Sequence, residues 1–150
     1  MTTQQDFEEL LRLLEKNKVL YMIVGGYAVA YHGFPRFTKD IDIFFKNSAS
    51  NIPRLKKALM EFGFPASKLP GKLFKTKGNI IQFGIIPVRV DLINDIEGVA
   101  FEDAEKNIQR GRYGKIEVNF IGKIDLIRNK KSAGRAQDTV DVEKLEKTNK

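Results

Sequence analysis

The 150-residue chain contains no cysteine and only one histidine. Without cysteine it can form neither a disulfide framework nor a thiolate zinc site, and a reducing, cytoplasmic setting is expected. Its longest apolar runs, residues 19–24 and 80–90, fall well short of the roughly 20 apolar residues of a membrane-spanning helix. The first 16 residues also lack the cationic leader and apolar block of a secretion signal. These absences predict a soluble, intracellular protein with no membrane span.

The length and the apolar content suit one packed core. The chain is 42% hydrophobic, which is enough for a single core but too little chain for two full-sized domains. We predict one domain over residues 1–150, with C-terminal helices from about residue 122.

The charge is unbalanced towards basic residues. The formal net charge is +7 and the pI is near 9.6, with much of the surplus in residues 46–77 and 110–131. Such a surface attracts polyanions, including RNA, DNA and nucleotides, but it does not identify any chemistry.

Helical and strand patterns are interspersed along the chain. Apolar spacing predicts helices over residues 7–14, 27–33, 52–62, 101–109, 123–131 and 137–147. Strand patterns cover residues 19–24 and 40–45, two segments within 73–93 joined by turns at Gly78-Asn79 and Ile86-Pro87, and residues 114–121. Strands and helices do not alternate regularly, so we predict an α+β fold with a mixed or antiparallel sheet flanked by helices.

Asp40 and Asp42 are the sharpest local feature. Side chains two apart on a strand project to the same face, so these carboxylates would stand together while Ile41 and Ile43 point into the core. A divalent cation allows both acids to remain ionised, and Mg²⁺ prefers carboxylate oxygens, water and substrate phosphates. An isolated Asp-x-Asp usually marks only a solvated strand edge, so the motif needs support from elsewhere in the chain.

Asp91 offers that support on a second strand. In residues 88–93, Val90 and Leu92 face one way while Arg89 and Asp91 face the other. If the two strands are neighbours, three acids can hold two metal ions, one for the attacking hydroxyl and one for the triphosphate. That arrangement is typical of nucleotidyl transfer.

Gly25 and Gly26 follow a strand and precede a helix. Backbone amides without a Cβ nearby can approach phosphate oxygens at such a helix start, although a glycine pair more often forms only a tight turn. Further candidate phosphate or nucleotide contacts lie between this turn and the acidic strand; they are Arg36, Thr38 and Lys39.

Three segments together resemble the nucleotidyltransferase (polymerase β-like) superfamily. They are VGGYAVAYHG at residues 24–33, RFTKDIDIFF at 36–45 and VRVDLI at 88–93. Within the superfamily, the chain is most similar to small bacterial members, including AbiEii-like type IV toxins and lincosamide or aminoglycoside nucleotidyltransferases. The resemblance implies that Asp40, Asp42 and Asp91 bind metal and that Gly25 and Gly26 bind phosphate.

The C-terminal segment, residues 125–145, resembles the last motif of these relatives. There the resemblance implies that Lys131, Arg135 and Asp138 border the nucleotide pocket, while a solvated helical face with spaced opposite charges explains them equally well. The chain departs from many relatives in having Gly26 where they have serine, so a hydroxyl contact to phosphate would be missing. It also lacks the extra domain that larger relatives use to hold the acceptor.

The resemblance implies an enzyme that moves a nucleoside monophosphate from an NTP to an acceptor hydroxyl. Two Mg²⁺ ions, or Mn²⁺, would assist, and the acceptor would be tRNA, a protein or a small molecule. A role as the toxin of a toxin-antitoxin system follows from the same likeness, with an antitoxin or a homodimer mate as partner. The alternative is a catalytically silent module of the same fold that binds a nucleotide or nucleic acid.

Overall fold

The structure is a computed structural model that describes residues 5–34, 38–83 and 89–147. Its helices and strands, in chain order, are α1 (Gln5–Lys16), β1 (Tyr21–Val24), α2 (Gly25–Tyr31), β2 (Asp40–Phe45), α3 (Asn51–Phe62), the 3₁₀ helix η1 (Ala66–Lys68), α4 (Gly71–Lys75), β3 (Ile80–Phe83), β4 (Arg89–Ile93), α5 (Phe101–Glu105), β5 (Gln109–Tyr113), β6 (Ile116–Phe120), α6 (Lys123–Ala133) and α7 (Ala136–Lys147).

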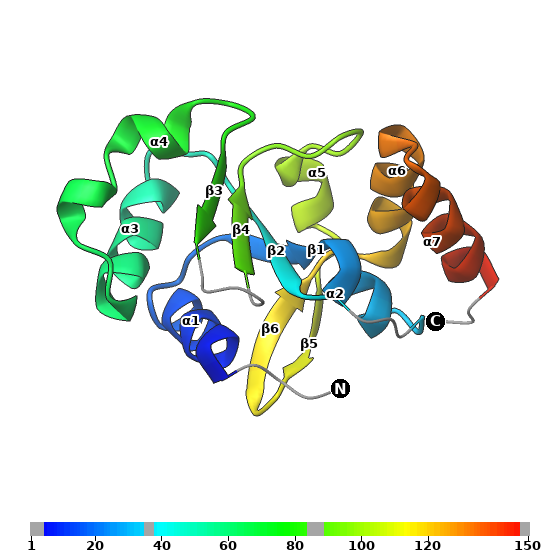
Figure 1. Cartoon of the computed structure of the whole chain (residues 1–150), viewed down its shortest axis with the longest axis horizontal. Helices are drawn as coiled ribbons and strands as arrows, with labels where there is room; N and C mark the ends of the chain where they lie inside the picture. Colours follow the sequence, from blue (N-terminus) through cyan, green and yellow to red (C-terminus); the bar gives the residue numbers. More distant parts are fainter. Residues whose placement is uncertain (1–4, 35–37, 84–88, 148–150) are drawn as a thin grey trace.

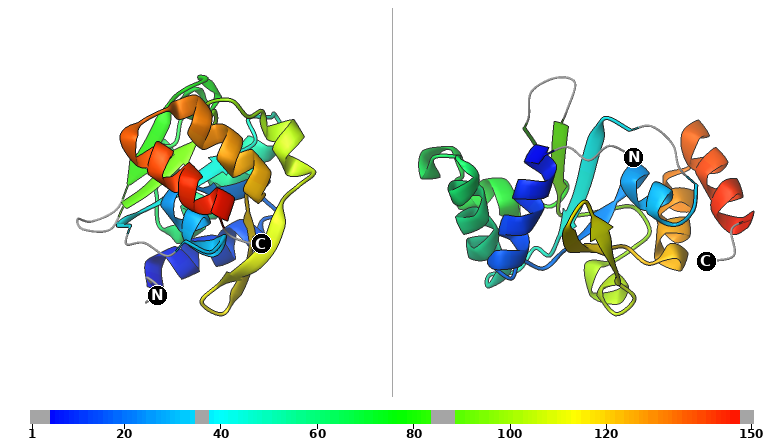
Figure 2. Two further views of the ribbon diagram at one scale, coloured as in Figure 1. Left: turned by 90° about the vertical axis from the view of Figure 1, so that its right-hand side faces the viewer. Right: turned by 90° about the horizontal axis from the view of Figure 1, so that it is seen from below.

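The strands form one mixed sheet in the order β3-β4-β2-β1-β6-β5. β1 pairs antiparallel with β2, whereas β2 pairs parallel with β4 and β1 pairs parallel with β6. β3 and β5 complete the two edges by antiparallel pairing. Figure 1 shows α3 and α4 at one end of the molecule and α6 and α7 at the other, with the sheet between them, and Figure 2 shows the same separation from below. The α+β prediction is confirmed.

The core lies where the predicted apolar patterns meet. α1 buries Phe7, Leu10, Leu11 and Leu14, which recur at helical spacing, and packs against α3. In β2, Ile41 and Ile43 are fully buried, as the alternation of that strand predicts. In the described ranges no helix is both long and apolar enough to cross a bilayer.

Two sequence predictions of secondary structure are wrong in part. Residues 73–75 belong to α4 and not to a strand, because the chain turns at Pro70 and places Phe74 in the core against Phe45. The helix predicted to run to Gln109 ends at Glu105, and Gln109 begins β5. Pairing with β6 decides this second case, since β5 itself is mostly exposed and polar. The turn predicted at Ile86-Pro87 lies outside the described residues.

Candidate active site

Two neighbouring strands bring the three predicted acids together. β2 and β4 run parallel, with Asp42 opposite Asp91 and Asp40 opposite Arg89. The same alternation that buries Ile41 and Ile43 leaves Asp40, Asp42 and Asp91 only partly buried. The carboxylates therefore share one face at the start of both strands.

The pKa of Asp42 is raised from 3.8 to about 7. Burial of its carboxyl group is the largest cause, followed by repulsion from Asp91 and Asp40 and a hydrogen bond with Asp91 that favours the protonated form. The positive charge of Lys130 opposes these effects only in part. The cluster thus carries more negative charge than its surroundings neutralise.

Arg89 supplies one positive charge to the cluster. Its Nη2 donates to Asp40 Oδ2 at 2.9 Å, and its Nε donates to Asp91 Oδ1 at 3.0 Å. The hydrogen bond to Asp91 and the negative charges of Asp91, Asp40 and Asp42 raise the pKa of the guanidinium group. The Arg89 side chain is 47% exposed, so it can leave the acids without disrupting the core.

Gly25 makes the closest backbone approach to the acids. It opens α2 with a φ of +67°, and a Cβ at this position would lie 2.1 Å from Asp42 Oδ2. Only glycine suits both the left-handed backbone and the missing space. Gly26 lies against Thr38, whose Oγ1 donates to the carbonyl oxygen of Asp40 at 3.2 Å. The glycine turn therefore packs directly against Asp42 and Thr38.

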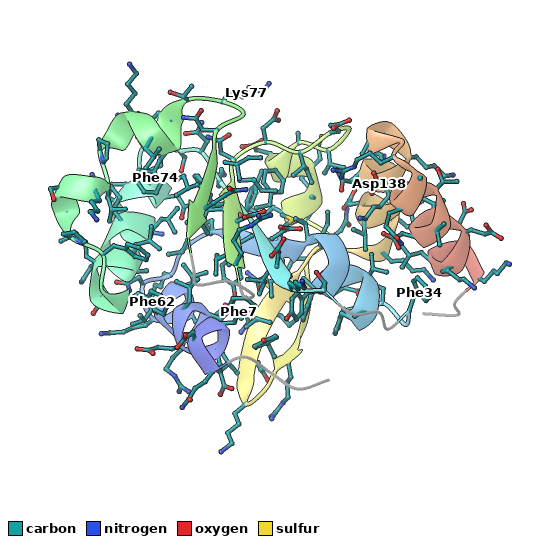
Figure 3. All side chains as sticks on the ribbon, viewed as in Figure 1. Phe7, Phe34, Phe62, Phe74, Lys77 and Asp138 are labelled. Atoms are coloured by element: carbon teal, nitrogen blue, oxygen red, sulfur yellow. The ribbon has the colours of Figure 1, made fainter. Side chains whose placement is uncertain are left out.

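A buried ionic cluster joins α6 to α7 near the acids. Lys130 Nζ lies 3.1 Å from Asp138 Oδ1 and 3.2 Å from Asp141 Oδ2, and all three side chains are almost fully buried. Arg135 Nε donates to Asp138 Oδ2 at 2.8 Å. Burial disfavours ionisation of Asp138, but the hydrogen bonds from Arg135 and Lys130 outweigh it and lower its pKa. Figure 3 labels Asp138 between these helices.

The predicted nucleotide contacts fall into separate places. Arg135, the residue before α7, pairs with Asp138, and the charge of Asp42 makes a small further contribution to its raised pKa. Lys131 instead points to the surface, where its Nζ lies 3.2 Å from Glu146 Oε2 and both side chains are more than half exposed. Lys39 is exposed next to the acids, and Arg36 lies outside the described residues.

Sequence patterns alone did not single out Lys130. Its signal was present, because Leu126 and Lys130 are four residues apart and therefore share the buried face of α6. A lysine at a core-facing position needs an acidic partner, which α7 supplies. The sequence placed Arg89 on the same face as Asp91 but did not predict that its guanidinium group bridges two acids.

No three His, Asp or Glu side chains in the described part of the chain already stand in a geometry that would hold a metal ion. In this conformation Arg89 pairs with two of the three acids at the start of β2 and β4. Coordination of a cation by Asp40 and Asp91 would therefore require Arg89 to swing away.

Solved structures with a similar fold include several nucleotidyltransferases. A Thermotoga maritima protein assigned as a nucleotidyltransferase matches with a TM-score of 0.61 and 15% identity, covering 92% of this chain and 88% of its own. The lincosamide antibiotic adenylyltransferase LnuA, solved with lincomycin, matches with a TM-score of 0.58 and 16% identity, covering 97% and 98%. The antibiotic-resistance factor ANT(2″)-Ia matches with a TM-score of 0.58 and 13% identity, covering 93% and 80%. These likenesses establish the nucleotidyltransferase fold.

A search of the curated proteins finds no matching sequence. The family model described as "Nucleotidyl transferase of unknown function (DUF2204)" matches residues 3–150 and so contains every acid and glycine of the site. This match extends over nearly the whole chain, and the fold agrees with it. The chain therefore belongs to this family of nucleotidyl transferases.

Proposed function

We propose that the protein transfers a nucleoside monophosphate from an NTP to an acceptor hydroxyl, with help from a divalent cation. The observation that carries this proposal is the convergence of Asp40, Asp42 and Asp91 beside the Gly25–Gly26 turn. Family membership supports the reaction type, and the raised pKa of Asp42 marks a site with surplus negative charge. A structural cluster would more often be neutralised, as the α6–α7 cluster is.

The donor set fits a hard divalent cation such as Mg²⁺ or Mn²⁺. Three carboxylates would supply oxygen ligands, and two of them, Asp40 and Asp91, already form ion pairs with Arg89. When bound, the cation would stabilise the triphosphate charge and lower the pKa of the acceptor hydroxyl. Asp40 and Asp42 would hold the cations, and Asp91 would complete the site and take the hydroxyl proton.

Other parts of the chain would hold the nucleotide. The bare amides of Gly25 and Gly26 would bind phosphate oxygens beside the acids. Arg135, whose pKa responds to the charge of Asp42, would pair with phosphate, and Lys39 and Thr38 beside β2 would contact it too. Arg36, which precedes them in the sequence, is proposed for the same role. Lys130 is already bound to two acids, so its part is to fix α7 over the site.

The acceptor belongs to one of three classes: an RNA, a protein or a small molecule. The similar fold of an adenylyltransferase solved with lincomycin brings an antibiotic-like acceptor into consideration. A toxin role would require an RNA or protein acceptor, and expression of the protein would then arrest growth unless the transferase site is disabled.

The test is transfer of label from each α-labelled NTP with Mg²⁺, offered total RNA, lysate protein and a lincosamide in separate reactions. Wild type should label one class of acceptor. Asp42→Asn should lower turnover by about 10³-fold, equivalent to about 4 kcal/mol, because it removes a ligand charge without changing the side-chain shape.

One further measurement identifies the failure if no label moves. Thermal unfolding with Mg²⁺ and each NTP reports binding directly, because a ligand of the folded state raises the melting temperature. NTP binding without transfer to any acceptor would favour the silent binding module. Unchanged turnover by Asp42→Asn would refute the assignment of the acids.

A further inference from the structure

Residues 46–77 carry a formal charge as large as that of the whole chain. Residues 46–77 contain eight of the 26 Lys and Arg residues and one of the 19 Asp and Glu residues, a formal charge of +7. The other 118 residues contain 18 of each sign and are neutral overall. A surplus of this size over about a fifth of the sequence makes this part of the chain a candidate for binding an anion.

This segment forms α3, η1 and α4 at one end of the molecule, away from α6 and α7 (Figure 1). Figure 3 labels Phe62, Phe74 and Lys77 on this side and Asp138 on the other. The acid cluster occupies the start of β2 and β4, whereas α3 follows the end of β2. The basic segment is therefore distinct from the candidate active site.

The cations of this end remain available to a ligand. The only acid of the segment, Glu61, accepts hydrogen bonds from Lys16 Nζ and Asn17 Nδ2, each at 2.7 Å. Those two hydrogen bonds, with smaller attraction from Lys16 and Lys57, lower its pKa. Among the described residues no carboxylate lies within ion-pair distance of Arg54, Lys57 or Lys75, and Arg54 only donates to the carbonyl oxygen of Lys18 at 3.4 Å.

Two adjoining hollows give the surface its shape. One, of about 390 Å³, is lined by Ile52, Met60, Lys75 and their neighbours, and the other by Lys18, Arg54 and residues of the α1 end. They share Pro53 and Lys57, so they lie side by side along α3. Lys16 also lines the second hollow but pairs with Glu61, and we name the other five basic residues of the linings the basic face: Lys18, Arg54, Lys56, Lys57 and Lys75.

The first hollow combines apolar side chains with cations, whereas the second is lined mostly by polar and charged residues. Met60 is 47% exposed and lies beside Ile52 and Pro53 in the first hollow. An unpaired nucleotide presents a phosphate to cations and a base to an apolar surface, so it fits this combination. An anionic membrane fits less well, because α3 turns its large apolar residues Leu55 and Leu59 into the core.

We propose that the basic face binds the sugar–phosphate backbone of single-stranded or looped RNA. This inference rests on the proposed function in one respect, since a bound RNA would present the acceptor hydroxyl to the acids. The binding itself depends only on the basic face. RNA is preferred to a small acceptor because two adjoining hollows with the five cations of the basic face exceed what one small anion would engage.

The experiment measures anisotropy of a fluorescein-labelled RNA stem-loop with a single-stranded tail, over a series of KCl concentrations. Arg54→Glu/Lys57→Glu/Lys75→Glu should weaken binding by at least about tenfold and reduce the salt slope by about 2, through loss of three phosphate contacts. The matched control, Lys106→Glu/Arg112→Glu/Lys115→Glu, makes the same change in net charge at exposed positions elsewhere and should change affinity by less than about twofold.

Equal losses in the two triple variants would overturn the proposal, because net charge and not the basic face would then explain binding. Equal affinity for DNA of the same sequence, or binding to phosphatidylserine vesicles without binding to RNA, would also overturn it. A triple glutamine variant at Arg54, Lys57 and Lys75, with its melting temperature, guards against a folding defect. It should repeat the loss of affinity.

Asp42→Asn separates the two proposals. It should bind the RNA as wild type does while losing transfer. RNA binding without transfer by wild type would refute the proposed function alone. Transfer to a small molecule without RNA binding would refute this inference alone.

Discussion

Two ionic clusters built from similar residues lie close together and behave in opposite ways. At the start of β2 and β4, three carboxylates share the positive charge of one arginine, and burial with mutual repulsion raises the pKa of Asp42 to about 7. Between α6 and α7, Lys130 and Arg135 balance Asp138 and Asp141, and the pKa of Asp138 is lowered.

The opposite pKa shifts indicate which of the two clusters is suited to binding a ligand. A buried ion pair that is neutralised internally has no spare charge, and its partners need each other for the folded state. A partly open cluster with surplus negative charge stores unfavourable energy that a cation would relieve. We therefore propose that the strand cluster carries catalysis and that the helix cluster supports α7.

Breaking the helix cluster should give the largest effect on stability. Lys130→Met would remove the positive charge that pairs with the buried Asp141 and would leave Asp138 paired with Arg135. We therefore expect the free energy of unfolding to fall by about 3–5 kcal/mol. Urea unfolding followed by circular dichroism measures this. A loss below about 1 kcal/mol would show that the buried cluster is dispensable.

The stability that depends on Asp42 in the strand cluster should fall as pH rises, opposite to the pH dependence expected from Asp138 in the helix cluster. Asp42 keeps its proton to about pH 7 in the folded state but loses it near pH 3.8 when unfolded. The folded state therefore binds more protons between these values, and its stability falls as pH rises through this range. In EDTA, Asp42→Asn should be more stable than wild type by about 2 kcal/mol above pH 7, with the difference vanishing near pH 4.

Asp138→Asn is the contrasting variant for that measurement. The pKa of Asp138 is lowered in the folded state, so its contribution is present above the unfolded pKa and is lost as pH falls through the folded value. This variant should be less stable than wild type at neutral pH, and the gap should close in acid. The same sign for both variants would contradict the division between the clusters.

A smaller effect is expected from Arg89. Arg89→Gln removes the guanidinium group that occupies Asp40 and Asp91, so the affinity for Mn²⁺ without NTP should rise roughly twofold to fivefold. Electron paramagnetic resonance of free Mn²⁺ measures this without turnover. Weaker Mn²⁺ binding would instead show that Arg89 holds the acids in place for the metal.

The smallest effect belongs to Lys131, which also serves as the matched control for Lys130. Its ion pair with Glu146 is exposed, so Lys131→Met should change the free energy of unfolding by less than about 0.5 kcal/mol. A loss as large as that of Lys130→Met would indicate a general response of α6 to substitution and not a buried cluster.

Much of the candidate site could be predicted from local patterns. The alternation of Asp40 and Asp42 with Ile41 and Ile43 sets their faces, because a strand has a side-chain period of two. Gly25 was predicted for its bare amide, and the structure adds a second reason, since a Cβ there would collide with Asp42. The roles of these residues in metal and phosphate binding stay predictions.

Patterns failed where distant pairing decides. Phe74 sits in a segment with strand-like composition, yet packing against Phe45 places it in a short helix. Lys130 and Lys131 are neighbours of identical chemistry, and the four-residue spacing from Leu126 puts Lys130 on the buried face without identifying its partners. Only the position of α7 makes one a buried partner of two acids and the other a surface residue.

The sequence alone accounts for the periods of the helices and strands, the face on which the three acids stand and the formal charge of +7 in residues 46–77. Those properties depend on side-chain spacing and composition alone. The tertiary structure decided which cations meet the acids, since that depends on strand register and helix docking between residues far apart in sequence. Arg89 bridges two acids because β2 lies beside β4, and Lys130 is buried because α7 folds back over α6.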